Sequence, residues 1–422
     1  MLITLTSGGS RGDSQPYIAL AHGFKAAGHR VRMVTTPDYA PLVEGADFDC
    51  RFVNLNIRSL IESERGRAML AAGGNPFMFL RRMRQLLEPF VEPMIVEAKK
   101  NFAGSDAFVM PSSGAMFGSA AFEWLNIPFC TALMQPLAAT SKFAHPFFPP
   151  LDPRIPGAAL YNRFTYAIAD FGVAAVAGPV VRRALRGAGV GKDLHRSSES
   201  IKRPLLFGYS PLVVKPPTDW PPNATATGYW FLDLASAWTP PAGLVDFVNA
   251  GPPPVSIGFG SMNNSDPAAA TKLVADALRL AGQRGILLSG WGGLATAALP
   301  DNGYMMESAP HDWLFPRMAA VVHHCGAGTT GAGLRAGVPA VPVPFFADQL
   351  FWARRLHELG VAPRPVPWKK LTAENLAQAI HEAVTNKEIK IRSEELGKKI
   401  RAEDGVGVAV EIAENYFCTI KR

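Results

Sequence analysis

The chain has 422 residues, of which 48% are hydrophobic and 18% charged, and its formal net charge is +7. These values exclude a disordered chain, and the length favours two domains over one core. The basic side chains form no stripe of the kind that binds nucleic acid, so no nucleic-acid partner is expected. Their densest groups, at residues 81–84, 390–401 and 421–422, leave a peripheral membrane contact open.

No uninterrupted apolar run reaches the roughly 18 residues that a membrane span needs. The most apolar stretch, residues 167–181, is broken by Asp170, Gly172, Gly178 and Pro179. The first residues do not resemble a secretory signal. The four cysteines are scattered without a C-x-x-C pair, which indicates reduced thiols, no metal site and a cytoplasmic protein.

The first 35 residues predict a strand–helix–strand unit. Residues 1–6 are apolar and predict a strand, and GGSRGD at 8–13 predicts a loop. Pro16 suits the first turn of a helix that runs to about Ala27, and a strand follows at 31–35. The alternation recurs at 106–133, which indicates an α/β fold with a parallel sheet covered by helices on both faces.

Two segments interrupt this alternation. Residues 141–156, SKFAHPFFPPLDPRIP, are rich in Phe and Pro and cannot form a regular element. They predict either a surface excursion or the wall of an apolar pocket. Residues 56–87 are weakly patterned, and their Met and Phe side chains are more typical of a core than of a pocket.

A Pro-rich stretch, KPPTDWPP at 215–222, predicts a stiff linker, after which a second α/β series begins. That series has strands at 255–259 and 286–289 around a helix at 267–283. We therefore expect an N-terminal domain (1–215), a linker (216–228) and a C-terminal domain (229–401). An amphipathic helix at about 402–422 is expected to pack back on the first domain.

The clearest motif is HHCGAGTTG at 323–331. It lies between a strand-like and a helix-like segment, so its G-x-G-x-x-G turn enters a helix N-terminus, where backbone N–H groups favour phosphate. An acidic residue about 20 positions on would complete a dinucleotide fingerprint, and Asp348 lies close to that distance. The motif alone leaves three interpretations open: a dinucleotide cofactor, a nucleotide-sugar, or a turn without a ligand.

In doubly wound folds, ligands bind at the carboxyl ends of the parallel strands. With two such domains, the sequence predicts a site in a cleft between them. Its expected walls are residues 7–15 on one side, and Ser261, Trp291 and residues 323–349 on the other.

Several motifs together resemble the family 1 glycosyltransferases, which have the GT-B fold of two Rossmann-like domains facing across a cleft. They are SRGDSQPYIAL (10–20), GFGSM (258–262), APHDWLF (309–315), HHCGAGTT (323–330) and PFFADQ (344–349). The resemblance covers nearly the whole chain. Within the family it is most similar to the sterol 3β-glucosyltransferases, which share SRGD-x-QPY and TGYWF (227–231), and antibiotic and macrolide glycosyltransferases are the nearest alternative. Cys325 stands where the family usually has glycine.

The resemblance implies an inverting, metal-independent transfer of a hexose, with glucose favoured, from a UDP-sugar to a hydrophobic acceptor. A sterol 3β-hydroxyl is the first expectation for that acceptor. The alternative is a macrolide, polyketide, flavonoid or glycolipid acceptor with a UDP- or TDP-sugar. No tightly bound cofactor is implied, and the oligomeric state stays open.

The same resemblance assigns the site residues. Asp13 is expected to be the general base, although from sequence it could equally cap the following helix. His324 is expected to donate to the diphosphate, and Asp348 and Gln349 to hold the sugar hydroxyls. Further nucleotide and diphosphate contacts are expected from Ser10, Ser261, Trp291, Ala309, Gly326, Ala327, Gly328, Thr329 and Thr330. The acceptor candidates are Met69, Phe77, Met134, Phe143, Phe147 and Phe148.

Three other classes compete with glycosyl transfer. A dinucleotide oxidoreductase would leave SRGD and the Asp348–Gln349 pair unexplained. A binding protein without activity would have no need for Asp13, His324, Asp348 and Gln349 together. A nucleotide-sugar epimerase would need no large apolar acceptor pocket.

Overall fold

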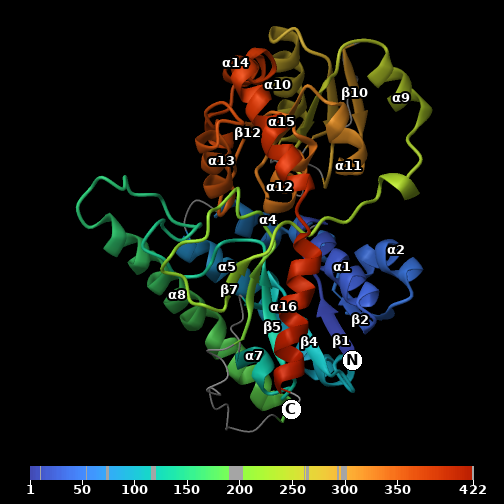
Figure 1. Cartoon of the computed structure of the whole chain (residues 1–422). Coiled ribbons are helices and arrows are strands. Elements are labelled where there is room, and N and C mark those ends of the chain that lie inside the picture. Colours follow the sequence, from blue (N-terminus) through green and yellow to red (C-terminus); the bar gives the residue numbers. More distant parts are fainter. Residues whose placement is uncertain are drawn as a thin grey trace. The chain divides into compact units, whose positions relative to one another are not determined.

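The computed structural model describes residues 1–9, 11–53, 55–72, 76–115, 120–189, 203–260, 262, 266–291, 294–295 and 302–420. The chain divides into two compact units (Figure 1). The first comprises Met1–Leu232 and Asp404–Arg422, and the second comprises Asp233–Glu403.

The described part of the first unit contains a seven-stranded sheet in the order β3-β2-β1-β4-β5-β6-β7, with all neighbours parallel. The order reverses between β1 and β4, so the carboxyl ends of these two strands mark a switch point for ligand binding. The strands are β1 (Leu2–Thr6), β2 (Arg30–Thr35), β3 (Asp49–Phe52), β4 (Ala107–Met110), β5 (Phe129–Leu133), β6 (Leu205–Phe207) and β7 (Ala224–Ala226).

Helices connect these strands. They are α1 (Arg11–Ala26), η1 (Pro37–Tyr39), α2 (Ala40–Val43), η2 (Glu44–Ala46), α3 (Ile57–Glu62), α4 (Glu64–Ala71), α5 (Pro76–Asn101), α6 (Ser112–Ala115), α7 (Ala120–Glu123), α8 (Ala158–Gly187) and α16 (Gly405–Ile420). The prediction of a loop through Asp13 is wrong, because α1 already begins at Arg11. Pro16 lies inside this helix, where its missing N–H removes one backbone hydrogen bond.

Helix α8 also differs from the sequence prediction. Asp170, Gly172, Gly178 and Pro179 do not interrupt it, and it is long and apolar enough to cross a membrane by length and composition. Only 28% of its most apolar window is buried. The sequence pattern therefore underestimated how much continuous apolar helix this segment forms.

Residues 216–228 belong to the first unit and are not the linker that their proline content predicted. They include β7, which pairs in parallel with β6. The Asp219 carboxylate accepts hydrogen bonds from the Thr140 hydroxyl (2.6 Å) and the Ser141 N–H (2.8 Å). Although desolvation opposes it, these bonds and the Arg163 guanidinium hold the pKa of Asp219 well below its usual range. Composition reveals a stiff backbone but not such contacts, which tie this segment to the Phe- and Pro-rich loop.

Helix α16 packs against α1 in the first unit. A Cβ added to Gly23 of α1 would lie 2.4 Å from a Val406 methyl group, so the two helices approach closely because Gly23 has no side chain. Phe417 is fully buried, and Nε2 of His29 lies within hydrogen-bond distance (2.5 Å) of the Glu414 carboxylate. The last helix is therefore part of the core of the first unit.

The described part of the second unit contains a five-stranded parallel sheet in the order β10-β9-β8-β11-β12. Its strands are β8 (Val255–Gly258), β9 (Gly285–Leu288), β10 (Gly303–Met306), β11 (Ala320–His323) and β12 (Ala340–Pro342). Its helices are η4 (Ala235–Ala237), α9 (Ala242–Asn249), α10 (Pro267–Leu280), α11 (His311–Leu314), η5 (Phe315–Arg317), α12 (Ala327–Ala336), α13 (Gln349–Glu358), η6 (Trp368–Lys370), α14 (Ala373–Thr385) and α15 (Lys387–Arg401). The order reverses between β8 and β11.

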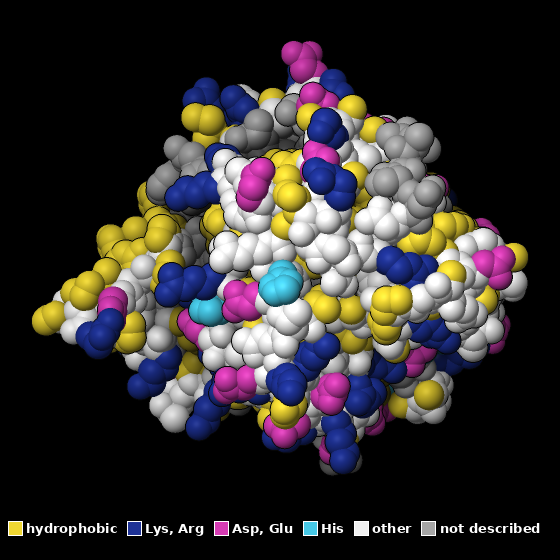
Figure 2. All heavy atoms as spheres, turned by 90° about the horizontal axis from the view of Figure 1, so that it is seen from above, with side chains coloured by type: hydrophobic (Ala, Val, Ile, Leu, Met, Phe, Trp, Pro, Cys, Tyr) yellow, Lys and Arg dark blue, Asp and Glu magenta, His cyan; other side chains and the backbone are white. Residues whose placement is uncertain are grey.

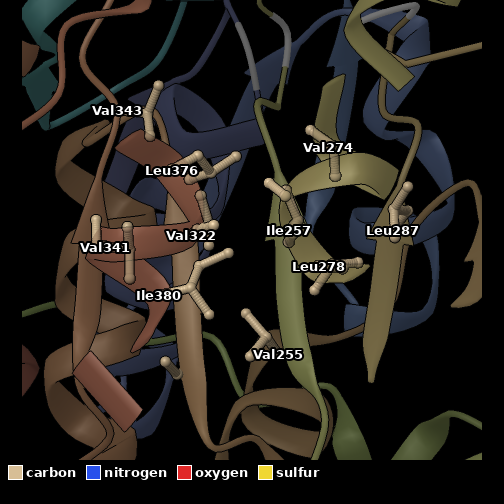
Figure 3. Packing of buried hydrophobic residues seen from close by; sticks show 14 of the residues in the cluster. Val255, Ile257, Val274, Leu278, Leu287, Val322, Val341, Val343, Leu376 and Ile380 are labelled. Carbon is tan, nitrogen blue, oxygen red and sulfur yellow. The ribbon is translucent and has the colours of Figure 1, made fainter. Parts of the chain in front are cut away.

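The core of the second unit lies between this sheet and two helices (Figure 3). Helix α10 contributes Val274 and Leu278, and α14 contributes Leu376 and Ile380. Each pair is spaced by four residues, so both of its side chains fall on one helix face. The strands contribute mainly β-branched side chains such as Val322, which suits a parallel sheet buried on both faces. Burial of each large side chain contributes about 1.5–3 kcal/mol to the free energy of unfolding. This packing holds the strand ends in register.

Candidate active site

Three loops meet at the carboxyl edge of the second sheet. His323, the last residue of β11, pairs with Gly258, the last residue of β8. The loops after β8 and β9 touch, because the Trp291 N–H donates to the Gly260 carbonyl (3.2 Å). A Cβ added to Gly290 would lie 2.3 Å from that carbonyl oxygen. Glycine at 290 therefore permits the close approach that brings Trp291 to this edge.

The His324 imidazole lies between two glycines. A Cβ added to Gly260 would come within 2.9 Å of the ring carbon Cε1, and one added to Gly326 within 2.6 Å of Nε2. The ring atom Nδ1 is buried and has no hydrogen-bond partner among the described residues. Burial lowers the pKa of His324 to about 4, so the ring is neutral at pH 7 and one ring nitrogen carries a proton to donate.

His323 has a different role from its neighbour. It is buried, and its Nδ1 accepts a hydrogen bond from the Cys325 N–H (3.1 Å). Burial, reinforced by His324 and His311, lowers the pKa of His323 to about 3. His323 thus supports the turn from inside, which leaves His324 as the better candidate for a ligand contact.

These two histidines predict a pH dependence of stability. Both are neutral in the fold and have a pKa near 6.5 when unfolded, so the unfolded chain binds more protons as the pH falls below about 6.5. The unfolding free energy should therefore fall between about pH 6.5 and pH 4, by up to about 1.4 kcal/mol per pH unit for each histidine. Urea denaturation across this range checks the slope.

His323→Asn is the matched test of this slope. The Asn side-chain oxygen can accept from the Cys325 N–H in place of Nδ1, but it does not titrate. The slope should become shallower in His323→Asn and stay unchanged in His381→Asn, since His381 is exposed. Equal slopes in wild type and His323→Asn would contradict a buried neutral His323.

Cys325 occupies a backbone position that favours glycine. Its backbone φ is +64°, in the left-handed region that costs side chains about 1 kcal/mol or more. Its thiol is fully buried and donates to the His323 carbonyl at 3.6 Å. A small side chain is therefore tolerated at a strained backbone position.

Two substitutions at Cys325 should separate backbone strain from side-chain burial. Cys325→Gly should leave the unfolding free energy within about 1 kcal/mol of wild type, because relief of strain offsets the lost thiol. Cys325→Val should lower it by roughly 3 kcal/mol, since a β-branched side chain fits the left-handed region poorly. The urea midpoints report both changes, and equal stability of the two variants would argue against a left-handed residue 325.

Helix α12 begins directly after this turn. Gly326 is its N-cap and offers no side chain to cap it. The N–H groups of Ala327, Gly328 and Thr329 belong to the first helical turn, where no helical carbonyl can pair with them. Thr330 is buried, and its N–H donates to the Gly326 carbonyl (2.9 Å). The helix therefore offers backbone N–H groups to an anion, whereas the Thr330 hydroxyl lies inside the fold.

Asp348 and Gln349 lie at the start of α13. The Trp352 indole N–H donates to the Asp348 carboxylate (3.2 Å). Gln349 is buried, and its side-chain oxygen accepts from the N–H groups of Phe345 (2.8 Å) and Phe346 (3.3 Å). Its side-chain nitrogen donates to the weak acceptor Sδ of Met262 at 3.3 Å. Gln349 thus shapes the loop before α13, and contact of the pair with a sugar stays a prediction.

The remaining candidates for nucleotide contacts differ in burial, and two of them cannot be placed. Ala309 is buried, just before α11, whose Asp312 accepts from the N–H groups of Leu234 (2.9 Å) and Ala235 (2.7 Å). The APHDWLF segment is thus a folded turn beyond β10. Trp291 is half-buried at the edge described above. Ser10 and Ser261 lie outside the described residues.

Asp13 lies in the first unit, in the first turn of α1. A Cβ added to Gly9, whose φ is +122°, would lie 2.8 Å from an Asp13 carboxylate oxygen. The carboxylate therefore sits against the loop that follows β1. A carboxylate here also stabilises the helix N-terminus, so the structural role and the role as base are both compatible with this position.

Two tyrosines that the sequence did not single out hold the loops around Asp13. The buried Tyr17 hydroxyl accepts from the Ser112 N–H (2.9 Å) after β4 and donates to the Ala132 carbonyl (2.9 Å) on β5. The Tyr39 hydroxyl donates to the Gly9 carbonyl (2.9 Å). The QPY motif, which contains Tyr17, could have pointed to this residue. No motif in the sequence distinguishes Tyr39.

The acceptor candidates lie largely in core-like settings. Met69 and Met134 are buried, and the Met134 sulfur faces Gly208. The rings of Phe147 and Phe148 pack edge-on against His145. Phe143 is half-buried, and the side chain of Phe77 lies outside the described residues. Met69 and Met134 therefore offer little free surface, and an acceptor role for the phenylalanines stays a prediction.

Comparisons with known proteins agree with this architecture. Residues 3–143 match the glycosyltransferase family 28 N-terminal domain, and residues 288–414 match the erythromycin biosynthesis protein CIII-like C-terminal domain. The solved structure of a kitacinnamycin glycotransferase has a TM-score of 0.69 at 18% identity and covers 99% of both chains. The structure of the calicheamicin glycosyltransferase CalG4 has a TM-score of 0.64 at 16% identity, covering 100% of this chain and 99% of that one. The predicted GT-B fold is confirmed.

Sequence relatives identify the family. The chain is 38% identical to a sterol 3-beta-glucosyltransferase of Neosartorya fischeri, over 97% of its own length and 29% of that protein. It is 34% identical to a sterol 3-beta-glucosyltransferase of Arabidopsis thaliana, over 97% of its own length and 67% of that protein. The chain thus spans less than a third of the fungal relatives and two thirds of the plant relative. It belongs to the glycosyltransferase family that includes the sterol 3-beta-glucosyltransferases.

Proposed function

We propose that this chain transfers a hexose, with glucose as the first candidate, from a UDP-sugar to the 3β-hydroxyl of a sterol. The observation that carries the proposal is the neutral His324 ring, held between Gly260 and Gly326 beside the uncapped start of α12. The similarity to sterol 3-beta-glucosyltransferases supports the acceptor class.

The leaving nucleoside diphosphate needs its developing charge stabilised. In the proposal, His324 donates a ring N–H to a phosphate oxygen, and the N–H groups of Ala327, Gly328 and Thr329 donate from the start of α12. Such donors are oriented before the reaction and cost no reorganisation as charge develops. This arrangement requires no metal ion to neutralise the leaving group.

The sugar is assigned to Asp348 and Gln349. The carboxylate only accepts hydrogen bonds, whereas the amide also donates, so together they can bracket neighbouring hydroxyls. The Gln349 amide nitrogen now contacts the thioether of Met262, and a sugar hydroxyl would be a stronger acceptor. Glucose is the first candidate because the similar proteins are sterol 3-beta-glucosyltransferases.

Asp13 is assigned as general base. The acceptor oxygen attacks the anomeric carbon, its proton passes to the Asp13 carboxylate, and the bond from that carbon to the diphosphate oxygen breaks. UDP leaves with the bonding electron pair. Because this is one displacement from the opposite face, the configuration at the anomeric carbon inverts.

A product screen by mass spectrometry tests the proposal. UDP-glucose and TDP-glucose are each paired with a sterol panel and with a macrolide and flavonoid panel, and the Asp13→Asn protein serves as the control. A hexose added to sterols from UDP-glucose supports the proposed donor and the proposed acceptor class. Transfer only to macrolides or flavonoids contradicts the sterol assignment, and no transfer despite UDP binding contradicts the proposed activity.

A natural-product acceptor is the second candidate. The match of residues 288–414 to the erythromycin biosynthesis protein CIII-like C-terminal domain favours it. We rank it lower because identity to the sterol 3-beta-glucosyltransferases extends over 97% of the chain.

Removal of divalent metal should leave the transfer rate essentially unchanged, because protein donors stabilise the diphosphate in the proposed mechanism. The test measures turnover in excess EDTA, with a metal-dependent glycosyltransferase assayed in parallel to show that chelation is effective. The described residues contain no group of three or more His, Cys, Asp or Glu side chains that could hold a metal. Loss of activity that Mg²⁺ restores would contradict the metal-free mechanism.

A further inference from the structure

Helix α8 carries an exposed apolar stripe that the proposed reaction does not use. Leu160, Phe164 and Phe171 are 75%, 59% and 73% exposed. They are spaced by four and seven residues, so they fall on one face of the helix. Ala167 and Ala174 lie on the same face and are also exposed. We propose that this stripe docks the protein on the surface of an anionic lipid bilayer.

The other parts of α8 are packed against the fold. Val180, Val181, Ala184 and Leu185 form a buried cluster with Val91 and Ile95 of α5. Nearer its start, Tyr166 is buried against His145, and the Thr165 hydroxyl accepts from the His145 N–H (2.9 Å). The helix therefore cannot leave the fold to span a bilayer without breaking this packing. Lying flat on the interface buries the free stripe and keeps the packed side intact.

The surface supports this placement. Figure 2 shows hydrophobic side chains gathered at the left edge of the view, the side on which Figure 1 places the beginning of α8. Lone exposed apolar residues need no explanation, but a stripe of large side chains along one helix does. The exposed Ile155, 46% accessible, precedes the helix and extends the apolar surface beyond α8.

Charge favours a lipid partner over a second copy of this chain. Helix α8 contains four arginines and one aspartate: Arg163 near its start and Arg182, Arg183 and Arg186 near its end, with Asp170 between them. Arg182 follows Phe171 by eleven residues, which returns it to the same face. Arg163 is paired with Asp219 and Arg183 with Glu88, so the positive charge offered to a lipid surface comes from Arg182 and Arg186 at the end of the helix, as in helices that bind anionic interfaces.

A symmetric dimer in which the two copies of α8 ran parallel through this face would place Arg182 opposite its own copy. An anionic bilayer has no such conflict.

Vesicle flotation of the full chain tests the proposal. The vesicles are phosphatidylcholine alone and phosphatidylcholine mixed with phosphatidylserine. The wild-type protein should float with the mixed vesicles, and Phe164→Ser/Phe171→Ser should bind at least tenfold more weakly, because most of the exposed apolar surface is removed. Leu280→Ser/Ile391→Ser is the matched control, since Leu280 and Ile391 are 50% and 54% exposed on other helices. It should bind like wild type.

The contribution of the arginines at the end of α8 is tested separately. Arg182→Gln/Arg186→Gln should lose the preference for phosphatidylserine while retaining the binding to phosphatidylcholine. UDP affinity should stay unchanged in all variants, so a failure of vesicle binding is distinguishable from a failure of the proposed activity.

The assignment of this face would be wrong if the wild-type protein did not float with the mixed vesicles, or if wild type and Phe164→Ser/Phe171→Ser floated equally. It would also be wrong if Arg182→Gln/Arg186→Gln kept the preference for phosphatidylserine. Sedimentation supplies a further check: if Phe164→Ser/Phe171→Ser converts a dimer to monomers without changing flotation, the stripe joins two copies of the chain.

Discussion

Asp13→Asn should lower the turnover number by about 10²–10⁴-fold while leaving UDP affinity nearly unchanged. The amide keeps the shape that lies against Gly9 but cannot take a proton, and a positioned general base contributes about this factor. Steady-state kinetics with a saturating sterol give the turnover number, and calorimetry gives the UDP affinity. The comparison separates loss of a base from loss of the fold.

Asp38→Asn is the control for this prediction. Asp38 is an exposed acid in η1 of the same unit and follows β2. The Asp38→Asn protein should keep the turnover number of wild type. If Asp13→Asn also retained turnover within a few-fold of wild type, Asp13 would be left with the structural role of stabilising the start of α1.

His324→Ala should weaken UDP binding by roughly 10- to 100-fold. A hydrogen bond to a charged group is worth about 1.5–3 kcal/mol, and each 1.4 kcal/mol changes the affinity tenfold. Calorimetry with UDP measures the change. His381→Ala is the control, because His381 is exposed on α14, and it should bind UDP like wild type.

Gly326→Ala tests the same ring without removing it. The added Cβ would meet Nε2 of His324 at 2.6 Å, so the imidazole must move. UDP binding should weaken here as well, although the histidine is still present. Unchanged affinity in both variants would refute a phosphate contact by His324, and weakening only in His324→Ala would show that the ring tolerates displacement.

The alternation of strands and helices was predictable because its signals are local. Strand 255–259, helix 267–283 and strand 286–289 correspond closely to β8, α10 and β9. The glycine turn between β11 and α12 was equally predictable, since a buried strand, a glycine run and a helix follow one another directly. The packing of the His324 ring between Gly260 and Gly326 was not predictable, because it brings together two loops that are more than sixty residues apart in the sequence.

The errors came from contacts that no local pattern encodes. Pro16 suggested the start of a helix, yet α1 runs through it. The prolines of 216–228 suggested a linker, but Asp219 binds Thr140 and Ser141 far away in the sequence. The contact of Gln349 with a sugar stays a prediction, but its bonds to the backbone N–H groups of Phe345 and Phe346 could be found only from the structure.

The position of α16 has a consequence for how the chain is made. Residues 233–403 form their own unit from one continuous stretch, whereas the first unit combines Met1–Leu232 with Asp404–Arg422. On the ribosome, the second unit can fold as soon as it emerges, but the first must wait for α16 and its Phe417. Until then, the surface of α1 around Gly23 that packs on Val406 stays open to solvent. Within this chain, the unit that begins first is thus the last to be completed, and it exposes apolar surface during that interval.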